Sequence, residues 1–152
     1  MDKKQMYLTL LRDLESLVAG ENDVTGVLAN AAALIYERTG YFWTGFYMVR
    51  DGMLRLGPFQ GPVACYRIGF GKGVCGAAWE RASTVLVPEV EEFPGHIACS
   101  SLSRSEIVVP LFRGSEVIGV LDIDSREKAA FDEMDREYLE KACAIVAAAI
   151  NQ

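Results

Sequence analysis

Cysteine is the residue type in this sequence with the plainest capacity for chemistry. Four cysteines occur in 152 residues, and three of them, Cys65, Cys75 and Cys99, fall in a middle stretch without clear helical or strand periodicity. A thiolate can attack an electrophile, and a second thiol can then resolve the product as a disulfide. Three small apolar core residues are the simpler alternative, and composition alone leaves both open. Cys143 lies on the alanine-rich face of a predicted helix, where we expect a buried apolar residue.

Metal binding is another use that these cysteines could serve. The spacings are C-x9-C and C-x23-C, and the only histidine, His96, stands three residues before Cys99. Neither spacing is the CxxC knuckle typical of zinc sites. A zinc protein that uses Cys65, Cys75, Cys99 and His96 is therefore an alternative hypothesis, while we expect no metal. His96 follows Pro-Gly, which is typical of a turn residue, so we do not favour it as a general base for Cys99.

Three acidic residues at the ends of two predicted strands form a second group. Asp122 and Asp124 stand at i and i+2, so they face the same side of one strand. Glu106 begins the partner strand, and counting back from the turn at 113–116 places it near both aspartates. Such a group can hold a cation, for example an α-ammonium group, and crowding raises at least one pKa, leaving a neutral acid able to donate a proton. A solvated strand end is the simpler alternative.

Two aromatic residues share a face of another predicted strand. Trp43 and Tyr47 are four residues apart, and side chains alternate along a strand, so both point to the same side. Core packing is the usual reason for such a pair. In a pocket, the same rings would offer a flat wall to a methyl group, a thioether or a cation.

The elements that must position these residues follow from hydrophobic periodicity and turn signals. We predict helices over 3–18, 23–38 and about 132–150, with a short helix over 73–82. We predict strands over 41–50, 53–59, around 64–68, within 83–90, and over 106–113 and 116–124, with a loop over 91–104.

This order of elements predicts an α+β fold in one domain, residues 1–152. A central antiparallel sheet carries the terminal helices on one face. The irregular segments 61–82 and 91–104 are then the only material left to cover the other face. A pocket between that face and these loops is a natural ligand site.

The composition excludes several classes of partner. The net charge is −6 without a Lys/Arg block, which argues against nucleic acid and anionic membranes. The sequence contains no run of eighteen apolar residues, and the first helix is interrupted by charges, unlike a signal peptide. Four cysteines are too few for a secreted disulfide scaffold. We expect a cytoplasmic protein.

The motifs around the cysteines and acids resemble those of one known family. The segments are ACYRIGFGKGVCG (64–76), FPGHIACSSLSRSEIVVPL (93–111) and GVLDIDS (119–125), with GYFWTGFYMV (40–49) and GPFQGPVAC (57–65). Together they resemble the free methionine-(R)-sulfoxide reductases, single-domain enzymes of the GAF fold, over nearly the whole chain. Gly69 departs from the family, in which proline is more usual at that place.

The resemblance implies an oxidoreductase that reduces free L-methionine-(R)-sulfoxide to methionine, protects against oxidative stress and is regenerated by thioredoxin. It implies no cofactor and a homodimer. It implies Cys99 as the nucleophile, Cys65 as the resolving cysteine and Cys75 as an auxiliary one, although the choice between Cys65 and Cys75 stays open. It also implies substrate contacts from Glu106, Asp122, Asp124, Trp43 and Tyr47, with Glu106 and Asp124 among the catalytic acids.

A GAF-type sensor module without catalysis is the alternative within the same fold. Such domains commonly bind small ligands, among them cyclic nucleotides. The three clustered acids argue against this interpretation, because phosphate ligands prefer basic residues.

Overall fold

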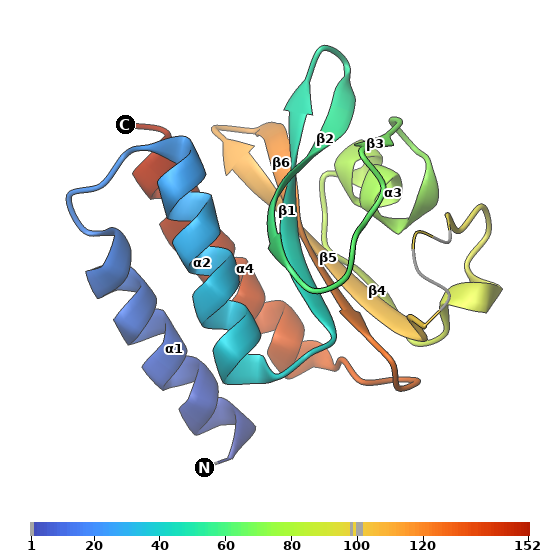
Figure 1. The fold of residues 1–152 in the computed structure, drawn as a ribbon, viewed down its shortest axis with the longest axis horizontal. Coiled ribbons are helices and arrows are strands. Elements are labelled where there is room, and N and C mark those ends of the chain that lie inside the picture. Colours follow the sequence, from blue (N-terminus) through green and yellow to red (C-terminus); the bar gives the residue numbers. More distant parts are fainter. Residues whose placement is uncertain (1, 98, 100–101) are drawn as a thin grey trace.

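The computed structural model describes residues 2–97, 99 and 102–152, which form a curled antiparallel sheet with helices on both sides (Figure 1). The strand order is β3-β2-β1-β6-β5-β4. The strands are β1 (Trp43–Arg50), β2 (Met53–Gln60), β3 (Arg67–Ile68), β4 (Val85–Val87), β5 (Ser105–Arg113) and β6 (Glu116–Ser125). The helices are α1 (Lys3–Val18), α2 (Val24–Thr39), α3 (Gly73–Arg81) and α4 (Glu133–Ile150), with a 3-10 turn over Val90–Glu92.

The sheet separates two apolar clusters. Helices α2 and α4 lie against one face, and α1 packs on the outside of both (Figure 1). The opposite face carries α3 and the long loops, with a smaller cluster around Trp43, Tyr47 and Cys75. The predicted α+β arrangement, with terminal helices on one face and loops on the other, is confirmed. Among the described residues, no helix is both long and apolar enough to cross a membrane.

Local signals fix the ends of the helices. The side chain of Asp23 accepts the backbone N–H of Gly26 at the start of α2, and Gly40 ends this helix in the left-handed conformation. Asp132 and Asp135 form a reciprocal capping box at the start of α4. The predicted boundaries of α1, α2, α3 and α4 lie within one residue of those observed.

Two hairpins build the centre of the sheet. Asp51 and Gly52 both have positive φ angles, 54° and 75°, as a tight hairpin turn between β1 and β2 requires. The second hairpin joins β5 to β6, which are buried over most of their length as predicted. Its register places Glu106 opposite Asp124 and Val108 opposite Asp122. The acidic residues are thus neighbours on one sheet face.

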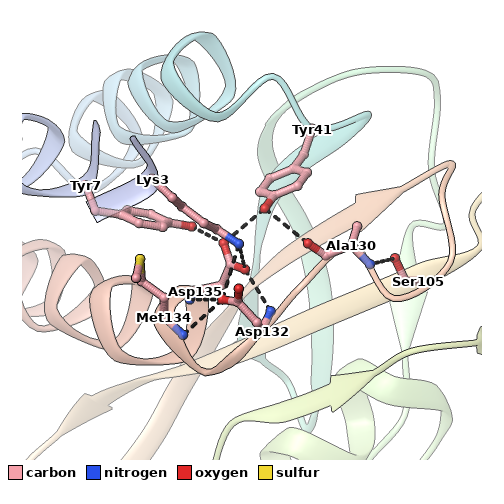
Figure 2. A network of polar contacts seen from close by, with 8 residues as sticks. All are labelled: Lys3, Tyr7, Tyr41, Ser105, Ala130, Asp132, Met134 and Asp135. Atoms are coloured by element: carbon pink, nitrogen blue, oxygen red, sulfur yellow. Dashed lines mark hydrogen bonds and ion pairs between the residues drawn. The ribbon is translucent and has the colours of Figure 1, made fainter. Parts of the chain in front are cut away.

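A buried polar network anchors α1 and the segment before α4 to the sheet (Figure 2). Asp135 is fully buried. Its carboxylate accepts hydrogen bonds from the hydroxyls of Tyr7 and Tyr41 and forms an ion pair with Lys3. The backbone N–H of Ala130 donates to the hydroxyl oxygen of Ser105, the first residue of β5. The network therefore also fixes the strand end next to Glu106.

The prediction of a strand around 64–68 is mostly wrong. Only Arg67 and Ile68 of the segment 64–68 pair with β2, and residues 61–66 run as an irregular loop. Gly61 adopts φ 131°, which is open to glycine, and a Cβ there would lie 2.6 Å from the Trp43 ring. The chain therefore leaves β2 by turning across the Trp43 ring instead of continuing as a strand.

Candidate active site

A cavity lies between the sheet and the loops, where the sequence predicts a pocket. The side chains that could do chemistry in its wall are Trp43, Tyr47, Cys75, His96, Cys99, Glu106, Asp122 and Asp124. It leaves about 50 Å³ for the centres of water-sized spheres. One water needs roughly 10–15 Å³ on this measure. In this state the cavity therefore has room for only a few waters.

Two of the three middle cysteines are joined at the cavity. Cys65, from the loop after β2, forms a disulfide with Cys99, 34 residues further along the chain, and the two Cα atoms are 5.5 Å apart. Both residues are partly exposed. The geometry thus brings together two cysteines from two irregular segments, as a thiol pair that cycles between reduced and oxidised forms requires.

The remaining cysteines are free and buried. Cys75 lies in the first turn of α3 and faces the acids, and burial together with their negative charge raises the pKa of its thiol. It is therefore a protonated thiol, poorly suited to attack. Cys143 packs in the core under α4, as predicted, and burial raises its pKa as well.

The acids form a compact buried group. Glu106 and Asp122 are 7% and 6% exposed, and Asp124 is partly exposed. The sulfur of Cys75, a carboxylate oxygen of Glu106 and a carboxylate oxygen of Asp122 all lie within 4.8 Å of one another. The predicted convergence of these carboxyl groups from β5 and β6 is confirmed by the strand register. The alternative of a solvated strand end is wrong for Glu106 and Asp122.

Burial and mutual repulsion keep protons on this group. Burial, and then the charges of Asp122 and Asp124, raise the pKa of Glu106 well above its ordinary value. Burial, and then the charge of Asp122, raise the pKa of Asp124 in the same direction. Burial also raises the pKa of Asp122, but hydrogen bonds from Glu106 and Cys75 oppose the shift. Asp122 is therefore the most favourable anion of the three, and Glu106 and Asp124 are the favoured neutral acids.

The aromatic pair forms one wall of the cavity. The rings of Trp43 and Tyr47 stack with centroids 6.1 Å apart, and Phe59 extends the stack behind Trp43 at 5.2 Å. Both side chains are nearly fully buried. The predicted shared face of Trp43 and Tyr47 on β1 is confirmed, and their rings reach the cavity.

Gly45 is a residue of this site that the sequence reasoning missed. A Cβ at Gly45 would lie 2.3 Å from Cβ of Phe59 and 2.6 Å from the Trp43 ring. Only glycine leaves room for the indole to lie over β1 at this position, beside the Phe59 side chain. A glycine in the middle of an aromatic strand, as in WTGFY, is the signal that could have found it.

His96 lies in the wall of the cavity, and burial lowers its pKa, so it is neutral at neutral pH. The hypothesis of a zinc site that uses His96 with three cysteines does not describe this state, because the sulfurs of Cys65 and Cys99 are bonded to each other. Backbone amides just before Cys99 are candidates to bind a substrate carboxylate, as in an anion-binding nest. Ala98, in that segment, lies outside the described residues.

The comparisons with known proteins agree with this geometry. A GAF domain family model matches residues 21–151. The free methionine-R-sulfoxide reductase of Escherichia coli K12 is 47% identical over 145 residues, which cover 95% of this chain and 88% of that protein. The chain belongs to the free methionine-R-sulfoxide reductase family of GAF-domain proteins.

Solved reductase structures support the same assignment. The free methionine-R-sulfoxide reductase of Neisseria meningitidis, solved in complex with its substrate, has a TM-score of 0.97 at 52% identity. The match covers 99% of this chain and 92% of that one. The Staphylococcus aureus reductase, also solved with substrate, has a TM-score of 0.91 at 41% identity and covers 95% of each chain. The resemblance predicted from the sequence motifs is confirmed.

Proposed function

We propose that this chain is a single catalytic domain that reduces free L-methionine-(R)-sulfoxide to L-methionine. The observation that carries the proposal is the Cys65–Cys99 disulfide, which lies at a small cavity lined by buried acids. Membership in the reductase family supports the same substrate. A phosphate-bearing ligand, as in a nucleotide sensor, would meet carboxyl groups where it needs positive charge.

The cavity offers complementary groups to a free amino acid. The buried carboxylate of Asp122 accepts hydrogen bonds from Glu106 and Cys75, and within the described part of the chain its Oδ1 has no further partner. A buried acceptor of this kind is costly unless a ligand satisfies it, and the substrate ammonium group would do so. The Trp43 and Tyr47 rings would contact the methyl end of the substrate through their flat faces.

A neutral acid would make the sulfoxide reactive. Sulfoxide sulfur is a weak electrophile until its oxygen accepts a proton or a strong hydrogen bond. Glu106 and its cross-strand neighbour Asp124 both have a raised pKa, so either carboxyl group can supply this proton. Asp122 would remain the anion that holds the ammonium group.

The thiol chemistry then proceeds in three balanced steps. The Cys99 thiolate attacks the protonated sulfoxide, and the hydroxyl group passes from the substrate sulfur to the Cys99 sulfur. The Cys99 S–O bond forms as the substrate S–O bond breaks, so methionine leaves and Cys99 becomes a sulfenic acid. The Cys65 thiol attacks that sulfur, which forms the disulfide and releases water. A dithiol reductant reduces the disulfide by two thiol exchanges. Cys75 would stay a buried auxiliary thiol, because its proton is strongly held.

Three further features complete the proposal. Thioredoxin is the reductant, which fits a disulfide between two partly exposed residues. The chain acts as a homodimer. It works in the cytoplasm, a reducing compartment in which a disulfide is typically transient and catalytic. No cofactor or metal takes part in the three steps above.

The proposal is tested with resolved epimers of free methionine sulfoxide, thioredoxin, thioredoxin reductase and NADPH. We expect turnover of the R epimer and at least 100-fold less of the S epimer, an order-of-magnitude expectation for a site that recognises its substrate through buried polar groups. Cys99→Ser should abolish turnover, while Cys143→Ser, a matched change of a core cysteine, should retain it. No methionine from the R epimer with fully reduced protein would reject the proposal.

A further inference from the structure

The two aromatic side chains of the cavity wall also hold the loop that carries Cys65. Nε1 of Trp43 donates a hydrogen bond to the carbonyl oxygen of Pro62 at 2.9 Å. The hydroxyl of Tyr47 donates to the carbonyl oxygen of Cys65 itself, also at 2.9 Å. Two side chains of one strand, β1, therefore attach to the loop of residues 61–66 at two points.

These contacts are costly to break, because both donors come from buried residues. Trp43 and Tyr47 are 5% and 2% exposed. A buried N–H or O–H group that loses its partner is desolvated without compensation. Pro62 supplies no backbone N–H of its own, so its carbonyl oxygen is the only backbone hydrogen-bonding group that it offers. The aromatic side chains thus restrain an otherwise irregular segment.

Restraint of this segment matters for a disulfide. Two cysteines can be bridged only when their Cα atoms lie roughly 4.4–6.8 Å apart with suitable Cβ directions. Cys65 and Cys99 meet this condition at 5.5 Å although they come from different loops. The backbone carbonyl that Tyr47 holds belongs to Cys65 itself, so this hydrogen bond acts directly at the position of the thiol.

We propose that Tyr47 and Trp43 are positioning residues for the resolving step, in which Cys65 condenses with oxidised Cys99. This inference rests on the proposed function for the source of the sulfenic acid. In the step, the Cys65 sulfur bonds to the Cys99 sulfur, the S–OH bond breaks, and the thiol proton leaves with the hydroxyl as water. The electrons balance without a further oxidant. The same two rings therefore serve substrate binding and the step that follows it.

The test separates the two steps in single turnover with Tyr47→Phe, which removes the hydroxyl and keeps the ring. Reduced protein is mixed with one equivalent of the R epimer, and methionine release and disulfide formation are followed separately by rapid quenching. We expect disulfide formation to slow by roughly fivefold more than methionine release, as the loss of about one hydrogen bond implies. A reagent that traps sulfenic acid should label Cys99 more extensively in Tyr47→Phe than in the wild type.

A parallel series keeps this test independent of the substrate. Hydrogen peroxide oxidises a reactive thiolate directly to a sulfenic acid, so the resolving step can be followed even if methionine sulfoxide is not reduced. Absence of methionine in the wild type would then reject the proposed function, while the peroxide series would still decide the positioning role.

Two further variants complete the design. Tyr66→Phe is the matched control, because Tyr66 stands next to Cys65 in the sequence and its side chain is 78% exposed. It should leave both rates at the wild-type values. Trp43→Phe, which removes the indole donor to Pro62, tests the other attachment point and replaces Tyr47→Phe if that variant does not fold. Equal slowing of both steps, or unchanged disulfide formation, would overturn the proposal.

Discussion

Glu106 on β5 lies directly opposite Asp124 on β6, with both side chains on the cavity side of the sheet. The pair is set by the hairpin that joins the two strands, so no long-range folding event is needed to bring the acids together. The surrounding burial and the charge of Asp122 raise the pKa of both. A simple strand register therefore places two acids that keep their protons at the cavity, where the proposed mechanism needs a proton donor for the sulfoxide oxygen.

The first prediction concerns Glu106 as an acid. Glu106→Gln should lower kcat for the R epimer by roughly 10²-fold, the usual contribution of a positioned proton donor. Wild-type activity should fall as pH rises through the raised pKa of Glu106, because the donor is lost when it ionises. The measurement is a pH profile of kcat. Glu116→Gln, at the exposed end of the same hairpin, is the control and should keep the wild-type profile.

The same carboxyl group makes a prediction for stability. A carboxyl group with a raised pKa binds its proton more tightly in the folded state than in the unfolded state. It therefore adds stability that is fully present below its unfolded pKa, and this stability is lost as the pH rises through its folded pKa. Glu106→Gln, which cannot ionise, should therefore become more stable relative to the wild type as pH rises above 4.5, the ordinary value.

The limit on this effect is about 1.4 kcal/mol of unfolding free energy for each pH unit between the two pKa values. Denaturant unfolding of reduced protein at several pH values measures it. A pH-independent difference between Glu106→Gln and the wild type would show that Glu106 ionises as easily in the folded chain as in the unfolded one.

A third prediction separates attack from resolution. In Cys65→Ser, Cys99 still attacks, but the sulfenic acid has no partner thiol. This variant should release about one methionine per site and then stop, since thioredoxin needs the disulfide. Quenched-flow measurement of methionine per active site checks this. Continuous turnover in Cys65→Ser at the wild-type rate would assign resolution to another thiol, and Cys65→Ser/Cys75→Ser would then identify it.

A fourth prediction concerns the network around Asp135 (Figure 2). Asp135→Asn removes a fully buried charge that accepts hydrogen bonds from Tyr7 and Tyr41. We expect a loss of roughly 1.5–3 kcal/mol in the free energy of unfolding, as for hydrogen bonds to a charged group. The control is Asp13→Asn, which breaks a more exposed ion pair with Arg38 and should cost much less stability than Asp135→Asn. Equal losses in both variants would contradict the structural role of the network.

Local patterns in the sequence are sufficient to predict much of this site. The period of two along a strand places Trp43 and Tyr47 on one face, and the turn before Glu116 fixes the register that brings Glu106 to Asp124. Both relationships depend on residues close in sequence or joined by one short turn. For that reason the shared face of the aromatic pair and the proximity of the acids could be predicted from the sequence, while core packing and a solvated strand end stayed open as alternatives to a role in a pocket.

Features that depend on distant segments could not be predicted in this way. The pairing of Cys65 with Cys99 joins two irregular loops, and the residues alone left Cys75 open as its rival. Most of the strand expected over 64–68 is absent, and within that segment the Tyr47 hydroxyl donates to the carbonyl oxygen of Cys65. No local signal reports these long-range contacts.

The most direct test of the account is a single turnover under anaerobic conditions. Fully reduced protein receives one equivalent of free methionine-(R)-sulfoxide, free thiols are alkylated, and peptides are mapped without reduction. We expect about one methionine per chain and one new disulfide, between Cys65 and Cys99, with Cys75 and Cys143 alkylated as thiols after denaturation. A disulfide that contains Cys75, or methionine release without any disulfide in the wild type, would contradict it.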